Sequence, residues 1–257
     1  MVRSIAFTAL ALCAAAAHAG WSTGIDVERF RWNEGTSPGV TETGQRYGLA
    51  VSYVRERDAG WQFGYRGRLY AGNKLKYEGA FLASGAPATG ETDYAGLLNE
   101  AQAGYRLPAS ELGAQFVTGL GWDYWERKIL PNQPENYHVV YGRLGFNLDR
   151  RVERAFFGGA GIKYPIYTSE DAHLRALGFR DNPKLHPKPE LSFYAEAGYR
   201  FTKRWSLVGY YDAFRFGESP AVATSSSTIP GCAARCNVVQ PASRSESLGL
   251  RLQYHFQ

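Results

Sequence analysis

Two cysteines near the C-terminal end of the chain have a spacing that indicates covalent chemistry. Cys232 and Cys236 are separated by three residues, Ala233-Ala234-Arg235. In an exported chain such a pair is available for a disulfide. Neither a histidine nor a further cysteine lies nearby, so a zinc site is disfavoured. We predict a Cys232–Cys236 disulfide that shapes a small loop locally, with no metal and no cofactor.

Ser169, Asp171 and His173 are the next residues whose types could do chemistry. A serine nucleophile, a histidine base and a carboxylate that orients the histidine form the catalytic set of many hydrolases. Here all three fall within five residues of one predicted loop. Residues of one short loop rarely reach the geometry of a triad, so we favour a solvated loop segment without catalysis.

Composition limits the kind of fold that could position these side chains. The 257 residues are 44% hydrophobic and 14% aromatic and include three cysteines. So many aromatic residues exclude a disordered chain, and three cysteines are too few for a disulfide scaffold. Outside the extreme N-terminus no apolar run reaches the roughly 18 residues of a membrane-spanning helix. The remaining classes are a soluble β protein and a membrane β protein.

A period of two in hydrophobicity predicts ten β-strands. No segment has a convincing helical period. We place the strands at 21–32, 46–57, 60–72, 93–106, 112–127, 138–150, 155–167, 189–202, 204–216 and 245–256.

The connections between these strands alternate in length. Connections after even-numbered strands are short, for example Asp58-Ala59-Gly60. Connections after odd-numbered strands are long and cover residues 33–45, 73–92, 128–137, 168–188 and 217–244. One rim of the sheet therefore has only short turns and the other carries long loops, which is typical of an up-and-down antiparallel meander.

Each predicted strand has an apolar and a polar face, and two features indicate that the apolar face meets lipid. In the last strand Leu248 and Leu250 oppose Gly249 and Arg251. Glycines recur on the polar face, as a narrow interior requires, whereas glycine on a water-exposed face would only weaken a strand. Aromatic residues that begin strands at the short-turn end form a girdle of the kind found at membrane interfaces: Trp21, Trp61 and Trp205.

Charge fixes the same orientation. If each lipid-facing charge cost about 2 kcal/mol, turning the polar faces outward would cost on the order of 20 kcal/mol, more than a typical total stability. Buried opposite charges are expected to pair inside the barrel. The charges that we place in the lumen are Asp26, Glu28, Arg66, Arg68, Glu100, Asp123, Arg143, Lys163, Glu196, Arg200, Asp212 and Arg251.

The N-terminal segment has the features of a secretory signal. Residues 1–19 contain Arg3, an apolar stretch and the small-residue site Ala17-His18-Ala19. We predict cleavage near Ala19, a signal peptide over 1–19 and one barrel domain over 20–257. The fold class is all-β: a ten-stranded antiparallel up-and-down transmembrane β-barrel with five long outer loops and short periplasmic turns.

These features resemble bacterial outer-membrane β-barrel proteins over nearly the whole mature chain. The final strand, Leu248-Gly249-Leu250-Arg251-Leu252-Gln253-Tyr254-His255-Phe256, carries much of the resemblance, although Gln257 follows the terminal aromatic. The resemblance implies the outer membrane of a Gram-negative bacterium. It implies outer-membrane lipids, including lipopolysaccharide, as partners, and the barrel-assembly machinery as a partner of the C-terminal strand. No nucleic-acid partner is implied.

The ten-strand outline also resembles the omptin surface proteases. Omptins use an Asp-x-His pair that faces a pair of acids on another outer loop. The matching residues here are Asp171 with His173, and Glu91 with Asp93. In such a set a carboxylate orients an imidazole that activates water, and two acids position that water. Glu91 departs from the aspartate pattern.

Three functions stay open at this point. We favour a monomeric, non-enzymatic barrel with a mostly occluded, charged lumen and loops for binding or structural roles. Basic and aromatic residues near the long-loop rim are consistent with anchoring to lipopolysaccharide phosphates. The alternatives are a narrow small-solute or ion channel, since ten strands slightly exceed the eight that side chains just fill, and an omptin-like surface hydrolase.

Overall fold

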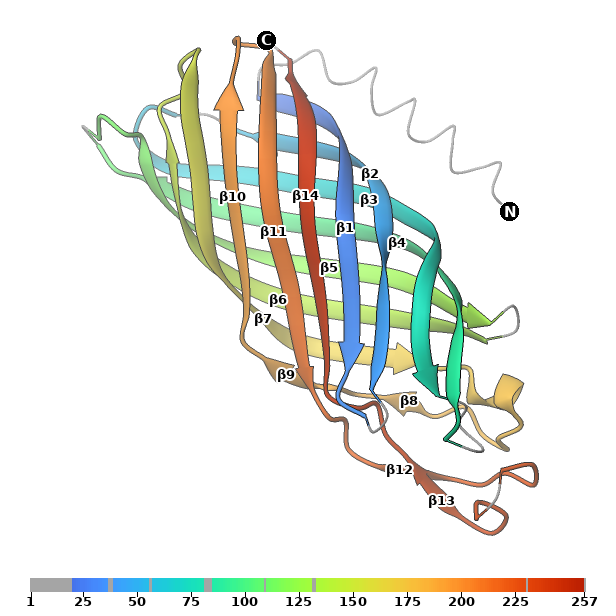
Figure 1. Cartoon of the computed structure of the whole chain (residues 1–257). Helices are drawn as coiled ribbons and strands as arrows, with labels where there is room; N and C mark the ends of the chain where they lie inside the picture. Colours follow the sequence, from blue (N-terminus) through green and yellow to red (C-terminus); the bar gives the residue numbers. More distant parts are fainter. Residues whose placement is uncertain are drawn as a thin grey trace.

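The computed structural model describes residues 20–256, except 37–38, 56, 81–84, 109, 131–132 and 230. The predicted signal segment 1–19 and Gln257 lie outside the described residues. Ten long antiparallel strands close into a barrel (Figure 1). They are β1 Trp21–Glu34, β2 Val40–Val54, β3 Gly60–Ala80, β4 Pro87–Arg106, β5 Ala114–Leu130, β6 Gln133–Asp149, β7 Ala155–Asp171, β10 Ser192–Arg200, β11 Trp205–Gly217 and β14 Ser243–His255.

Each long strand pairs with its neighbour in sequence, and β14 pairs with β1 to close the barrel. The predicted up-and-down topology is therefore confirmed. Both chain ends of the barrel lie at the short-turn rim, where β1 begins and β14 ends (Figure 1). Among the described residues, no helix is long and apolar enough to cross a bilayer.

The first three outer connections differ from the expected extents. Most of 33–45, 73–92 and 128–137 is strand, because β1 with β2, β3 with β4, and β5 with β6 continue their pairing beyond the predicted ends. The residues between these strands are only 35–39, 81–86 and 131–132. Inward side chains of the extensions are buried, and this packing extends the barrel wall outward.

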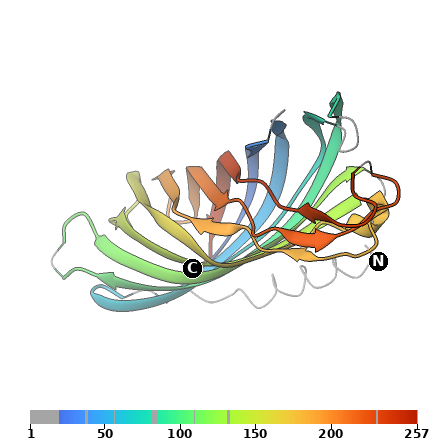
Figure 2. The same ribbon diagram turned by 90° about the horizontal axis from the view of Figure 1, so that it is seen from below.

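The last two outer connections are long and pack against each other. We call residues 172–191 and 218–242 the loop unit. Besides coil it contains the 3-10 helix η2 (Leu174–Leu177) and four short strands, β8 Lys184–Leu185, β9 Lys188–Glu190, β12 Val222–Thr224 and β13 Cys236–Val238. Strand β8 pairs with β7, and β9 pairs with β11. Figure 2 views the molecule from the end that carries this unit.

A small apolar cluster holds the loop unit together. Leu174 and Phe179 from the first segment are buried with Cys232 from the second. The Ser226 hydroxyl donates to the Gly178 carbonyl at 2.8 Å. The predicted disulfide between Cys232 and Cys236 is present, with a Cα–Cα separation of 4.9 Å. The covalent turn therefore contributes to a packed core between two loops.

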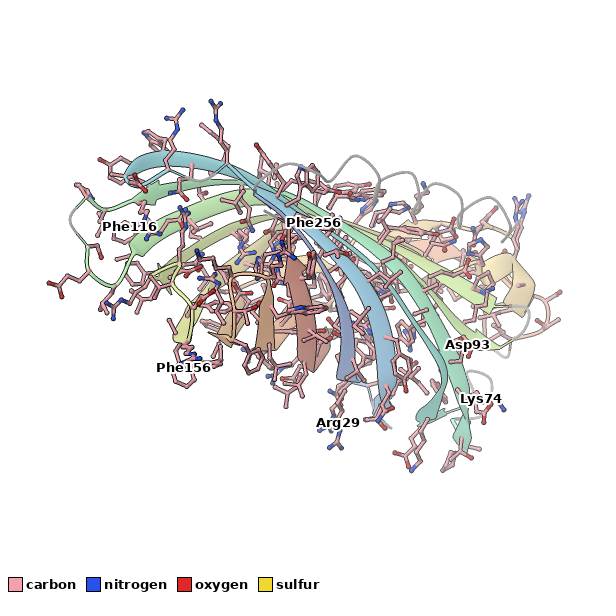
Figure 3. All side chains as sticks on the ribbon, turned by 90° about the horizontal axis from the view of Figure 1, so that it is seen from above. Arg29, Lys74, Asp93, Phe116, Phe156 and Phe256 are labelled. Atoms are coloured by element: carbon pink, nitrogen blue, oxygen red, sulfur yellow. A yellow bond between two sulfur atoms is a disulfide. The ribbon has the colours of Figure 1, made fainter. Side chains whose placement is uncertain are left out.

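Apolar side chains cover the outside of the barrel wall. Phe116 is 57% exposed, Leu250 54% and Phe156 79%. Figure 3 shows Phe116 and Phe156 at the periphery of the molecule, directed away from the barrel. Exposed hydrocarbon on this scale is typical of a surface that meets lipid. Leu250, Phe193 and Trp122 all lie on this outer surface instead of in a central core.

The barrel interior contains a second apolar region, which we call the aromatic plug. It comprises Phe30, Trp32, Tyr70, Leu75, Tyr94, Trp125, Tyr137, Val139, Tyr141, Phe214 and Phe216. These residues point inward from the middle and outer parts of β1, β3, β4, β5, β6 and β11.

Inward glycines make room for these rings. A Cβ atom at Gly121 would lie 2.2 Å from the Tyr141 ring, and one at Gly96 would lie 2.3 Å from the Tyr70 ring. Glycine is therefore required at both positions by the close approach of a ring from the neighbouring strand.

Candidate functional site

The lumen near the short-turn end holds a network of ion pairs. Asp26 accepts hydrogen bonds from Arg68 at 2.5 Å and from the Tyr210 hydroxyl at 3.1 Å. Arg251 approaches the same carboxylate at 3.4 Å. Glu28 pairs with Arg68 at 2.9 Å and with Arg46 at 2.6 Å. Two acids from β1 thus hold basic residues from β2, β3 and β14.

A second part of the network lies on the opposite wall. Arg143 donates to Glu100 at 2.6 Å, and the Tyr141 hydroxyl donates to the other oxygen of Glu100 at 2.8 Å. Arg66 spans the lumen from β3 to reach Glu196 in β10, with an N–O distance of 3.3 Å. These contacts connect walls that are far apart in sequence, which stiffens the barrel across its width.

The remaining lumen charges are paired or hydrogen-bonded as well. Lys163 lies 2.6 Å from Asp212, and its ammonium lies 3.6 Å from the centroid of the Phe214 ring. The Tyr70 hydroxyl donates to Asp123 at 2.9 Å. Arg200 makes two hydrogen bonds of 3.0 Å to Asp149, an acid that the sequence analysis did not place in the lumen.

A cavity of about 270 Å³ lies among these charges. Its lining extends from Gln253 and His255 near the short-turn rim to Tyr141 and Lys163 at the lower surface of the aromatic plug. The inner half of the lumen is therefore partly open and polar.

The outer half is different because one arginine there holds three acids. Arg127 of β5 pairs with Glu34 at 2.8 Å, with Glu42 at 2.5 Å and with Glu135 at 2.9 Å. Arg127 is 1% exposed. The Tyr94 hydroxyl donates to Glu42 at 2.6 Å, so the cluster is tied to the aromatic plug.

Aromatic rings surround this acid cluster. Trp32 is fully buried and donates from Nε1 to Glu34 at 2.8 Å. Its ring centroid lies 5.5 Å from that of Tyr137 and 5.2 Å from the Arg127 guanidinium carbon. Trp125 stacks on Tyr137 with a centroid separation of 5.0 Å. Stacked rings and a cation over a ring pack together inside the barrel at this level.

The cluster lies beyond the lipid-facing part of the wall. Its neighbours on the outer face of β5 are charged: Glu126 and Lys128 pair with each other at 2.9 Å and are partly exposed to solvent. The next two outward side chains of β5 toward the short-turn end are aromatic, Tyr124 and Trp122, as expected for an outer aromatic girdle. The Arg127 cluster is thus above the hydrocarbon layer.

Burial shifts the protonation of this cluster. The pKa of Glu135 is raised to about 7, chiefly because the carboxyl is buried and because Glu34 and Glu42 repel its charge, against the attraction of Arg127. Burial also raises the pKa of Glu170 well above its usual value, with Glu135 and Glu34 adding repulsion. The Gln240 amide nitrogen, in the orientation that satisfies both ends of the amide, donates to both Glu170 oxygens at 3.0 and 3.1 Å.

The Asp171–His173 pair forms, but separately from the other two acids. His173 Nδ1 lies 3.3 Å from the Asp171 carboxylate, which also accepts from Asn182 at 2.6 Å. Strand pairing places Asp171 opposite Asn136 of β6. Asp93 lies on β4, so β5 and β6 separate it from Asp171.

Glu91 and Asp93 have partners of their own. The Asp93 carboxylate accepts from the Lys74 backbone N–H at 2.8 Å, and Glu91 lies 3.8 Å from the Lys74 ammonium. Lys74 has a positive φ of 57°, so the aspartate stabilises a bulge in β3. Figure 3 places Asp93 and Lys74 at the outer end of the barrel. Within the described part of the chain, neither acid contacts His173.

Ser169 is not joined to this pair. It is 4% exposed and lies opposite His138 in the β6–β7 register. In the described residues His173 bonds to Asp171 through its backbone N–H and through Nδ1. The structure therefore does not assemble Ser169, Asp171 and His173 as a nucleophile, acid and base. No group of three or more His, Cys, Asp or Glu residues arranged to hold a metal occurs among the residues that the structure describes.

The acids held by Arg127 were not among the predicted lumen charges. Glu34, Glu42 and Glu135 fell in segments predicted as loops, and Arg127 stood at the last position of a predicted strand. The signal was present in part: Glu42, Gly44 and Arg46 continue the alternation of β2, and Glu135, Tyr137 and Val139 continue that of β6.

Comparisons with known proteins give the fold but no family. No protein-family model matches the chain, and no curated protein matches it. The outer membrane protease OmpT from Escherichia coli has a similar structure, with a TM-score of 0.50, 10% identity and coverage of 92% of this chain and 97% of OmpT. Neisserial surface protein A superposes with a TM-score of 0.38 and 13% identity over 93% of this chain and 98% of that protein. The chain has the fold of an outer-membrane β-barrel protein.

Proposed function

We propose that this protein is a sealed barrel of the Gram-negative outer membrane that displays the loop unit for a binding or structural role, without catalysis and without conduction. The observation that carries the proposal is the aromatic plug with its acid cluster. Trp32, Tyr137 and Phe216 are at most 1% exposed inside the barrel, and Arg127 cross-links β1, β2, β5 and β6. A pore at this level would require both rings and ion pairs to move.

The location rests on two supports. The signal-like segment 1–19 favours export, and the apolar outer wall with aromatic residues near both rims favours a bilayer. Strand β14, which ends in Tyr254 and His255 beside β1, is the part that we expect the barrel-assembly machinery to engage. Fractionation of cells that express the full chain tests the location: the protein should enter the outer-membrane fraction and leave it only with detergent.

Planar-bilayer recording tests the seal. The purified, folded full-length protein should give no steady discrete openings. A variant with Trp32→Ala, Trp125→Ala and Arg127→Ala provides the matched control, since it removes two rings of the plug together with the ion pairs of Arg127 and should conduct more often than the unaltered protein. Regular openings of the unaltered protein would overturn the proposal.

Surface hydrolysis is the second candidate function, and one observation favours it. The Asp171–His173 pair lies at the outer end of β7, at 3.3 Å, in a barrel whose fold is shared with a protease. A catalytic imidazole oriented by a carboxylate can activate water. Peptide cleavage by the wild type and by Asp171→Asn, His173→Ala and Asp93→Asn variants tests this function. We expect no cleavage above background in any of them, and cleavage lost only in the variants would establish the hydrolase.

A further inference from the structure

The lipid-facing wall contains a groove of about 970 Å³ across β10, β11, β14, β1 and β2. Its floor includes two small residues, Ala197 and Gly209, which lie opposite each other in the β10–β11 register. Larger outward side chains border it, namely Leu248, Leu250 and Val27. The lining of the groove is therefore mostly hydrocarbon, which suits an apolar chain.

Gly209 leaves space in this groove. A Cβ atom at Gly209 would lie 3.7 Å from both the Ala197 carbonyl oxygen and the Leu250 side chain, which is ordinary contact. The barrel therefore has room for a side chain at Gly209, unlike at Gly121, where a ring occupies the space. The absence of a side chain at 209 leaves volume on the lipid side of the wall.

Arginines lie at the outer end of the groove. Arg29 lines the groove and pairs in register with Leu248, which pairs in turn with Tyr211. Arg31 is the next outward residue on β1, and Arg215 and Arg244 form a register pair farther out on β11 and β14. Figure 3 shows Arg29 at the outer part of β1, directed away from the barrel.

These guanidinium groups have few partners of their own. Within the described part of the chain, the side chains of Arg29 and Arg215 make no hydrogen bond or ion pair, and Arg31 bonds only to Asn33, at 3.0 Å. Arg244 pairs with Glu246 and donates to the Tyr211 hydroxyl at 3.2 Å. Among the described residues Glu246 is the carboxylate that pairs with one of these four guanidinium groups, and Glu190 lies opposite Arg215 in the β9–β11 register.

We infer that this surface binds an acylated, phosphorylated lipid of the outer leaflet. One acyl chain lies in the groove over Gly209, and a phosphate lies between Arg29 and Arg31. A guanidinium presents paired N–H donors that match phosphate oxygens, and its weaker hydration than an ammonium favours such a pair at an interface. The apolar groove and the cationic edge fit the two ends of the same molecule. The inference rests on the proposed seat of the barrel in the outer membrane.

A second groove provides a matched comparison. It has a volume of about 650 Å³ on the outer face of β3 to β7, and a Cβ atom at its Gly142 would lie 3.7 Å from Ile166. Its one lining arginine, Arg143, has its guanidinium committed to Glu100 inside the barrel. The second groove thus has the cavity without the exposed cations.

Native mass spectrometry of the full mature protein in mild detergent, titrated with bis-phosphorylated lipid A, tests the groove. Gly209→Leu should weaken lipid retention about tenfold, while Gly142→Leu should change it less than about twofold. Equal losses in both variants, or no loss in Gly209→Leu, would overturn the inference. Heat-modified migration in electrophoresis checks that each variant is folded.

Substitution of the arginines tests the same inference without relying on the folding of the Gly209→Leu variant. Arg29→Gln with Arg31→Gln should weaken retention about tenfold, whereas Lys74→Gln with Lys76→Gln, which removes the same charge from β3, should change it less than about twofold. Inorganic phosphate should not displace the lipid. Displacement of the lipid by inorganic phosphate would indicate a site for free anions. Dimers that are present in the wild type and lost in Gly209→Leu would indicate that a second copy of the chain occupies the groove. Either result contradicts the inference. A folded barrel in the outer-membrane fraction with no selective retention refutes this inference and leaves the proposed location intact.

Discussion

The two halves of the lumen contain the same kinds of residues in different proportions. In the inner half, acids and bases alternate around a cavity, and Arg66 and Glu196 are each about a quarter exposed. In the outer half, three acids share Arg127 among packed aromatic rings. The inner half resembles a hydrated charge network and the outer half resembles a protein core. The comparison indicates that aromatic packing dominates the outer half of the lumen and that ion pairs dominate the inner half.

The largest expected effect is the loss of Arg127. Arg127→Ala leaves Glu34, Glu42 and Glu135 buried without their shared cation. Removing one member of a buried ion cluster costs about 3–5 kcal/mol of unfolding free energy. Urea unfolding in detergent at pH 8, followed by tryptophan fluorescence, measures the change. A loss below about 1 kcal/mol would mean that the outer half is hydrated like the inner half.

Removal of Trp32 should have the next largest effect. Trp32→Ala deletes a fully buried ring that contacts Tyr137 and Arg127, and such truncations cost about 3 kcal/mol or more. The same unfolding assay measures the stability. Trp61→Ala is the control, because Trp61 is 54% exposed at the lipid-facing short-turn rim. Equal losses in the two variants would contradict the plug as a packed core.

Protonation of Glu135 should make the outer half sensitive to pH. Its pKa rises from 4.5 to about 7 on folding. Below pH 4.5 the Glu135 carboxyl is protonated in both the folded and the unfolded state, and its full contribution to the unfolding free energy is present. As pH rises from 4.5 to 7 the unfolded state loses this proton first, so the contribution falls, and it is lost above pH 7. Glu135→Gln has no such proton. The variant should match the wild type at pH 5 and exceed it at pH 8 by about 2 kcal/mol.

A pH profile of thermal unfolding for the two proteins checks this expectation. A constant difference between them from pH 5 to pH 8 would show that Glu135 keeps an ordinary pKa. Glu126→Gln serves as the control, since Glu126 faces outward and pairs with an exposed lysine.

The smallest expected effect is the loss of Arg66 in the inner half. Its ion pair with Glu196 is 3.3 Å long and partly solvent-exposed. Solvent-accessible ion pairs contribute about 0–1 kcal/mol. Arg66→Gln should therefore lower the unfolding free energy by no more than about 1 kcal/mol in the urea assay. A loss as large as that of Arg127→Ala would remove the distinction between the two halves.

The sequence predicts the barrel well because its signal is local. Alternation within each strand, such as Leu248 and Leu250 against Gly249 and Arg251, assigns the faces without any knowledge of partners. The short turns are equally local, since Asp58-Ala59-Gly60 contains its own turn chemistry. Strand order then follows from the strict alternation of connections.

The outer half could not be predicted in the same way. Arg127 and Glu42 are 85 residues apart, and nothing in either segment identifies the other as its partner. Polar residues in 33–45 and 128–137 are typical of loops, so their burial depends on the whole ring of strands being present. The packing of Phe179 on Cys232 is equally nonlocal. For the same reason Asp171 and Asp93 could be matched by spacing, although β5 and β6 lie between them.

The seam between β1 and β14 has a consequence for biogenesis. Its register runs from Ser22 opposite His255 to Glu34 opposite Ser243, so the first and last strands of the barrel are lateral partners. Any nascent fragment that lacks β14 has two unsatisfied edges, and neither can be tolerated in hydrocarbon. Closure of the barrel must therefore wait for β14, and a truncation that removes β14 should yield a product that is degraded instead of a smaller barrel.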